Sequence, residues 1–153
     1  MSTTVWMAIG VAVVVVFWAA AVHNRLRQLR NRVDNAFAQI DVQLKRRHDL
    51  IPNLVEVARG YMAHESSTLE AVARARGQAA QAAAHARRHP GQAAAMASLA
   101  GAEAALGSSL GQLMVLTESY PDLKADAQMQ SLSEEITSTE NRLGFARQAY
   151  NDQ

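Results

Sequence analysis

The sequence predicts an all-α protein, in which a single N-terminal transmembrane helix continues into an antiparallel bundle of three to four long helices. Three observations lead to this prediction. Residues 5–22 carry no charged side chain, and apolar residues recur at helical spacing through most of the chain that follows. Aromatic residues make up only 5% of the chain, and the many alanines have high helix propensity, which favours a narrow helical bundle over a sheet protein.

Residues 5–22 are long enough to cross a bilayer. At about 1.5 Å per residue a helix of this length covers roughly 27 Å, close to the hydrocarbon thickness. Trp6 and Trp18 lie near its two ends, where amphipathic rings favour the headgroup region. A cleaved signal peptide is the alternative, because the alanines at 19–21 resemble a cleavage site, but the start MSTT lacks a basic region. We therefore expect residues 1–23 to form an uncleaved transmembrane anchor.

Four arginines follow the anchor directly and set its expected orientation. Basic residues beside a transmembrane helix are retained in the cytoplasm, so we expect the N-terminus outside and residues 24–153 inside as a cytoplasmic bundle. The same arginines could also attract anionic lipids, at about 1 kcal/mol per basic residue near the surface. These residues, named here the basic collar, are Arg25, Arg27, Arg30 and Arg32.

Composition and motifs argue against several classes of function. The absence of cysteine excludes a disulfide framework and cysteine-ligated zinc, and a net charge of +1 gives no field that would attract nucleic acid. His48 and His64 are too far apart on one predicted helix to share a metal ion. No phosphate-binding loop, dinucleotide fingerprint or nucleophile motif occurs. We therefore expect no enzyme, and infer no cofactor, metal or small-molecule substrate.

The first helix of the bundle carries an apolar stripe from Leu26 through Leu29 to Met62, within a sector of roughly 120°. The phase of the stripe is the same on both sides of Pro52, so we expect a kinked helix that continues. Proline has no N–H and its ring crowds the carbonyl four residues earlier. The carbonyl of His48 should therefore need another donor.

Further helices follow from start and stop signals. Residues 67–70 read as an S-x-x-E capping box that opens a second helix, and the cations at 87–89 are expected to cap its C-terminus. A third helix is expected from about Gln92 to Thr117, and residues 119–123 as a turn. A last helix should begin near Asp126. Its expected buried residues are Met129, Leu132, Ile136, Leu143 and Tyr150, and the third helix carries a coiled-coil-like seam at Leu99, Leu106 and Leu113.

Charged residues interrupt the predicted stripes at one level of the bundle. Arg47 and His48 take inward positions on the first helix, Glu103 lies in the seam of the third, and Glu140 lies in the stripe of the last. When the helices run up and down from the membrane, all four residues fall at similar heights. Isolated buried charges are costly, so we hypothesise a polar layer in which these residues meet. The alternative is that Arg47 reaches solvent and both glutamates face water.

Several stretches of the chain resemble the LemA family of bacterial membrane proteins. They are NRLRQLRNRVDNAFAQIDVQLKRRHDLIPNLVEVARGYMAHE at 24–65, ESYPDLKA at 118–125 and STENRLGFARQAYND at 138–152, and the segment IDVQLKRRHDLIPNLVE is the most specific. The resemblance implies one N-terminal transmembrane helix in a bacterial inner membrane, with the N-terminus outside and a helical bundle in the cytoplasm.

The chain departs from the family pattern in two places. Phe37 stands where members usually have tryptophan, a mild aromatic change. Members also continue beyond the position of Asn151 into an aromatic-rich tail. We expect this chain to lack that tail, either as a shortened member or as a fragment.

Two hypotheses of function remain, and the resemblance implies no reaction. The first is a membrane-anchored helical scaffold that self-associates or docks partner proteins on the cytoplasmic face, without catalytic chemistry. The alternative is a bilayer-organising protein that acts on anionic lipids through the basic collar. We favour the scaffold, because the net charge is small and most basic residues have acidic neighbours in the sequence.

Overall fold

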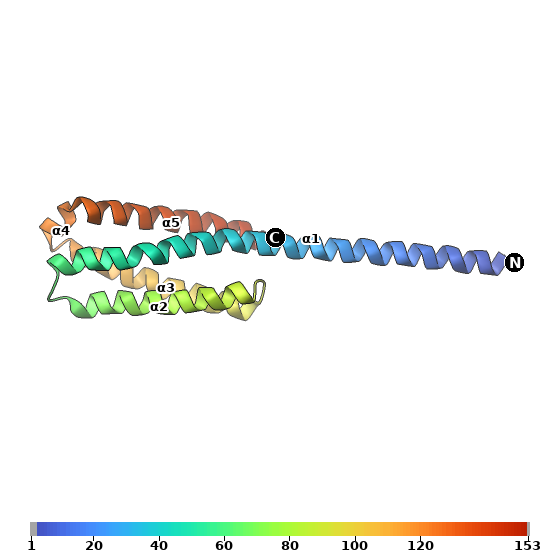
Figure 1. The fold of residues 1–153 in the computed structure, drawn as a ribbon, viewed down its shortest axis with the longest axis horizontal. Coiled ribbons are helices and arrows are strands. Elements are labelled where there is room, and N and C mark those ends of the chain that lie inside the picture. Colours follow the sequence, from blue (N-terminus) through green and yellow to red (C-terminus); the bar gives the residue numbers. More distant parts are fainter. Residues whose placement is uncertain (1–2, 153) are drawn as a thin grey trace.

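A computed structural model describes residues 3–152, and its regular elements are all α-helices (Figure 1). No strand occurs within this range, so the predicted all-α class is confirmed. The helices are α1 (Thr3–Tyr61), α2 (Ser66–Arg88), α3 (Ala93–Thr117), the short α4 (Pro121–Ala125) and α5 (Ala127–Asn151).

Helix α1 is far longer than the others, and its N-terminal half stands clear of the bundle (Figure 1). Its 59 residues span about 88 Å at 1.5 Å per residue. The apolar N-terminal part is long and apolar enough to cross a membrane; α3 also meets that test but forms part of the bundle. The helix passes through Pro52 without ending, so the predicted continuation is confirmed.

The bundle begins later along α1 than the apolar stripe suggested. Leu26 and Leu29 are 60% and 39% exposed, and the buried positions of α1 start at Ala36. The prediction that these two leucines face the core is therefore wrong. No other helix accompanies α1 at their level, so a correctly phased stripe has nothing to pack against (Figure 1).

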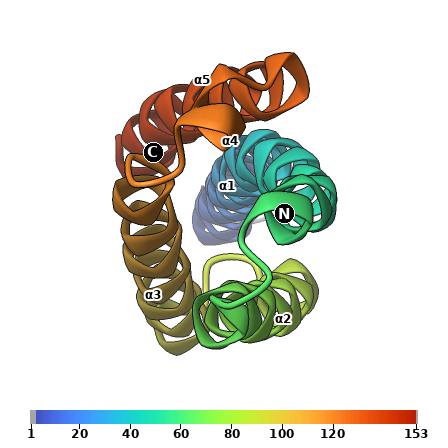
Figure 2. The same cartoon turned by 90° about the vertical axis from the view of Figure 1, so that its left-hand side faces the viewer.

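The four long helices form two pairs (Figure 2), and the helices of each pair run antiparallel (Figure 1). Helix α5 packs along α1 and α3 packs along α2, while α1 and α2 join the pairs. The short α4 lies at the end of the bundle far from the anchor, where it meets α1, α3 and α5. Within residues 3–152, no Cα atom of α3 lies within 8 Å of one in α1 or α5. Only side chains therefore join α3 to these two helices.

The apolar core consists of two separate clusters. One surrounds Ile51, Leu106 and Ile136 and reaches the α4 end of the bundle. The other surrounds Leu44, Leu99 and Leu143 and lies toward the anchor. The residues named for the two clusters lie on α1, α3 and α5. On each of these helices, the residue of one cluster lies within two turns of the residue of the other. The level between the clusters is the level at which the polar layer was predicted.

Details of the helix ends correct two predictions and confirm a third, the start of the last helix near Asp126. Helix α2 begins at Ser66 with Glu65 as N-cap and no capping side chain, so the capping box at 67–70 is wrong because the helix starts two residues too early for it. The predicted turn at 119–123 contains the start of α4, where proline in the first turn loses no helical hydrogen bond. Asp126 caps α5 by accepting a hydrogen bond from the N–H of Met129 at 2.9 Å.

The cations at the end of α2 divide between two roles. Arg88 donates to the carbonyl of Ala84 at 3.3 Å, and His89 Nδ1 lies 3.1 Å from the carbonyl of His85, as a capping role requires. Arg87 instead forms a two-point ion pair with Asp41 of α1, at 2.9 and 2.7 Å. The capping prediction is therefore wrong for Arg87, which fastens α2 to α1.

Candidate functional site: a buried ionic layer across the bundle

Charged side chains cross the bundle between its two apolar clusters. Arg47, His48 and Glu103 are 3%, 5% and 2% exposed. Glu103 joins the other two: Oε2 accepts a hydrogen bond from Arg47 Nη1 at 3.0 Å, and Oε1 lies 2.6 Å from His48 Nε2. Glu103 is also the only charged residue of α3. The ionic layer, defined as Arg47, His48, Glu103 and Glu140, thus joins α3 to α1 where their backbones stay apart.

Glu140 belongs to the ionic layer only at its edge. The structure buries Thr139 instead, so the prediction that Glu140 faces inward is wrong. Glu140 is 61% exposed, and its Oε2 lies 3.8 Å from Arg47 Nη2. The hydroxyl of Thr139 donates to the carbonyl of Ile136 at 2.7 Å, so this inward residue needs no partner from another helix.

Arg47 does not reach solvent, which removes the alternative considered for it. Its side chain is 3% exposed and has carboxylates on two sides, from α3 and from α5. Its Nε is nevertheless buried without a hydrogen-bond partner. A buried ion pair with one unsatisfied donor adds little net stability, so we expect it to act mainly on the relative register of the helices that supply it.

Arg76 completes the site, and it is not among the residues predicted for the polar layer. Its Nε donates a hydrogen bond to the backbone carbonyl of His48 at 3.0 Å. This is the carbonyl that Pro52 deprives of its helical donor, because proline lacks an N–H. The missing donor is therefore supplied by α2, the helix that packs beside this part of α1.

A signal for Arg76 exists in the sequence. Leu69 and Val72 are buried positions of α2, and the residue seven beyond the first and four beyond the second is Arg76. An arginine at such a position must find a partner at the edge of the core. Many of the residues around Arg76 are alanines. Because alanines occur on all sides of α2, they do not mark which side faces the core.

The remaining predicted residues lie away from the ionic layer. The basic collar is fully on the exposed part of α1, and within residues 3–152 none of its arginines takes part in an ion pair. Over the same range, no group of three or more His, Cys, Asp or Glu side chains is placed to hold a metal ion.

Together these features define a class: a membrane-associated helical bundle, with an apolar N-terminal helix and a buried ionic layer in the bundle. A model of the LemA family matches residues 36–153, and the chain therefore belongs to the LemA family. The match begins at Ala36, the first buried position of α1, and so covers the bundle and every residue of the ionic layer. A search of curated proteins gives no match.

Proposed function

We propose that the protein is a non-catalytic scaffold, anchored in a bacterial inner membrane by the start of α1, whose cytoplasmic bundle pairs with a second copy of itself. The observation that carries this proposal is the charge distribution of α3. Its only charged residue, Glu103, is turned inward to the ionic layer. The outward side of this 25-residue helix is therefore uncharged along its full length.

The outward side of α3 also has the form of a helix-pairing surface. Exposed residues recur at alternating spacings of three and four, as in the seam of a coiled coil. Most are small enough for a second helix to approach closely, and Val115 at one end is 74% exposed. These residues, named here the α3 outer seam, are Ala94, Ala97, Gly101, Ala104, Ser108, Gly111 and Val115.

A second copy fits this seam better than an arbitrary partner. An uncharged seam presents no like charges to its own copy, so it is compatible with a two-fold interface in which each residue meets its equivalent. A single-pass anchor gives all copies the same orientation in one membrane. Two α3 helices related by an axis along the membrane normal therefore run parallel, with Ala104 facing Ala104.

Cysteine crosslinking in membranes tests the proposal directly, because the chain has no native cysteine. We expect Ala104→Cys to form a disulfide-linked dimer on mild oxidation, and Gln148→Cys, an exposed position on α5, to remain monomeric. The yield at position 104 should be the same in liposomes of neutral and of anionic lipid. Equal yields at both positions would show random collision instead.

The bilayer-organising alternative has one observation in its favour: the basic collar is exposed and forms no ion pair with any residue from 3 to 152. It predicts crosslinking that rises with anionic lipid and falls with salt, because basic residues near a charged surface are screened within a Debye length. Replacing the four collar arginines by glutamine should then abolish the Ala104→Cys dimer. Under the scaffold proposal that replacement leaves the dimer in place.

A further inference from the structure

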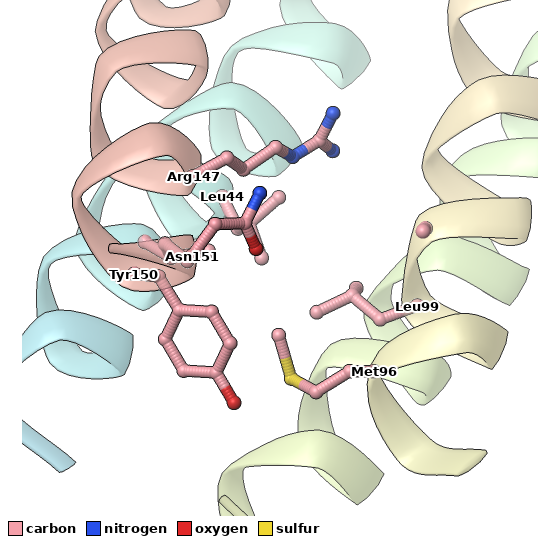
Figure 3. A pocket seen from close by; sticks show the side chains of 8 residues that line it. Leu44, Met96, Leu99, Arg147, Tyr150 and Asn151 are labelled. Atoms are coloured by element: carbon pink, nitrogen blue, oxygen red, sulfur yellow. The ribbon is translucent and has the colours of Figure 1, made fainter. Parts of the chain in front are cut away.

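A cavity lies between α1, α3 and α5 near the end of the bundle that faces the anchor (Figure 3). Its volume is about 210 Å³. Its walls are apolar: Ile40 and Leu44 come from α1, and Met96, Leu99 and Ala100 come from α3. The cavity is separate from the ionic layer and from the α3 outer seam.

The cavity follows from how the helices pair. Alanines such as Ala83, Ala86 and Ala95 fill this part of the core and let α3 approach α2 closely. Helix α5 packs on α1 instead, and no Cα atom of α3 lies within 8 Å of α5 in the described part of the chain. The α3–α5 side of the bundle therefore stays open at the level where Ala100 presents only a methyl group.

The rim of the cavity on α5 is polar. Arg147, Tyr150 and Asn151 line it, and Figure 3 shows the Arg147 guanidinium extending from α5 toward α3, above the Asn151 side chain. Arg147 belongs to no ion pair among residues 3–152. The Arg147 guanidinium, unpaired within this range, and the Asn151 amide therefore both lie at the edge of an apolar cavity.

We propose that this cavity binds a single-chain fatty acid of medium length, with its chain among the apolar walls and its carboxylate on Arg147 and Asn151. A guanidinium matches the two oxygens of a carboxylate, and the Asn151 amide supplies another donor. By comparison with a cavity of about 150 Å³ that takes up benzene, the volume holds a chain of roughly eight carbons. Two acyl chains of a phospholipid do not fit.

Methionine methyl signals provide a local test in the full chain, reconstituted in nanodiscs. Met96 lines the cavity, whereas Met62 and Met129 lie in the other core cluster. With ¹³C-labelled methionine methyls, we expect octanoate to shift the Met96 signal saturably and to leave the Met62 and Met129 signals in place. Octyltrimethylammonium, which has the opposite charge, should leave the Met96 signal unshifted at the same concentrations.

Paired variants separate the carboxylate contact from the apolar contact. We expect Arg147→Ala to weaken octanoate binding about tenfold, and Arg142→Ala, an exposed arginine on the same helix outside the cavity, to leave it unchanged. Ala100→Phe should fill the cavity and abolish the shift, with Ala105→Phe as its control on α3. Equal octanoate affinity in the Arg147→Ala protein, or shifts of all methionine methyls together, would overturn the proposal. The α3 dimer is measured separately, so either proposal can fail alone.

Discussion

Glu103 is the residue on which the ionic layer depends. It accepts a hydrogen bond from Arg47 and lies against His48, and all three side chains are buried. Glu103→Ala leaves a buried guanidinium without its main partner, a change that typically costs about 3–5 kcal/mol. We expect the urea midpoint of the bundle, followed by circular dichroism at 222 nm, to fall accordingly.

Replacing the ionic layer by apolar residues should have a different effect. The combined Arg47→Met, His48→Leu and Glu103→Leu variant removes the buried charges together with their desolvation cost, so we expect stability equal to or above that of the native chain. A loss as large as that of Glu103→Ala alone would show that the layer stabilises the fold and does more than set the helix register.

Arg76 and Pro52 should be energetically coupled through the His48 carbonyl. Arg76→Met removes the side-chain donor of that carbonyl and is expected to cost about 1–3 kcal/mol. Pro52→Ala restores an N–H four residues beyond His48, which can bond the same carbonyl within the helix. The cost of Arg76→Met should therefore be smaller when Pro52 is alanine. Identical costs in the two backgrounds, from a double-mutant cycle of urea unfolding, would refute this coupling.

Of the four helices α2 to α5, whose starts all lie within the described residues, α5 alone is capped by a side chain, and that cap is sensitive to pH. The Met129 N–H and then the Tyr61 hydroxyl hydrogen-bond the Asp126 carboxylate, which lowers the pKa of Asp126. A lowered folded-state pKa means that the cap contributes fully above about pH 4 and is lost as pH falls through the folded value. Asp126→Asn, whose amide oxygen does not titrate, should reduce the acid-induced drop in melting temperature. If the acid-induced drop in melting temperature is the same in Asp126→Asn, groups other than Asp126 cause it.

The positions of the helices could be predicted because apolar residues recur at helical spacing over long stretches. The residues at which helices begin and end could be predicted less well. Arg47, His48 and Glu103 each continue a stripe of large apolar residues, so their inward position follows from spacing. On α5 the choice between Thr139 and Glu140 depends on a rotation of one residue, which spacing alone does not resolve. Leu26 and Leu29 have the correct phase, but the sequence does not tell where other helices begin to cover α1. Arg76 lies among alanines, where apolar contrast is weakest.

At the scale of the whole molecule, α1 runs without interruption from the candidate membrane span into the bundle. One helix holds the anchor, the basic collar, Pro52 and half of the ionic layer. The same helix contacts α3 through Glu103, whose inward position leaves the uncharged side of α3 facing outward. Glu103 of the ionic layer and the proposed pairing surface therefore lie on opposite sides of one helix, α3.

Counting the copies in each complex tests whether α3 pairs with a second α3. Full-length chains carrying one dye on Gln148→Cys are placed at low density in liposomes, and the bleaching steps of single spots are counted. We expect mostly two steps for the otherwise native chain and mostly one for Ala104→Glu, because a charge on the α3 outer seam would face its own copy. Gln128→Glu, an exposed control on α5, should keep two steps. Single steps in the native chain, or two steps that survive Ala104→Glu, would contradict the account.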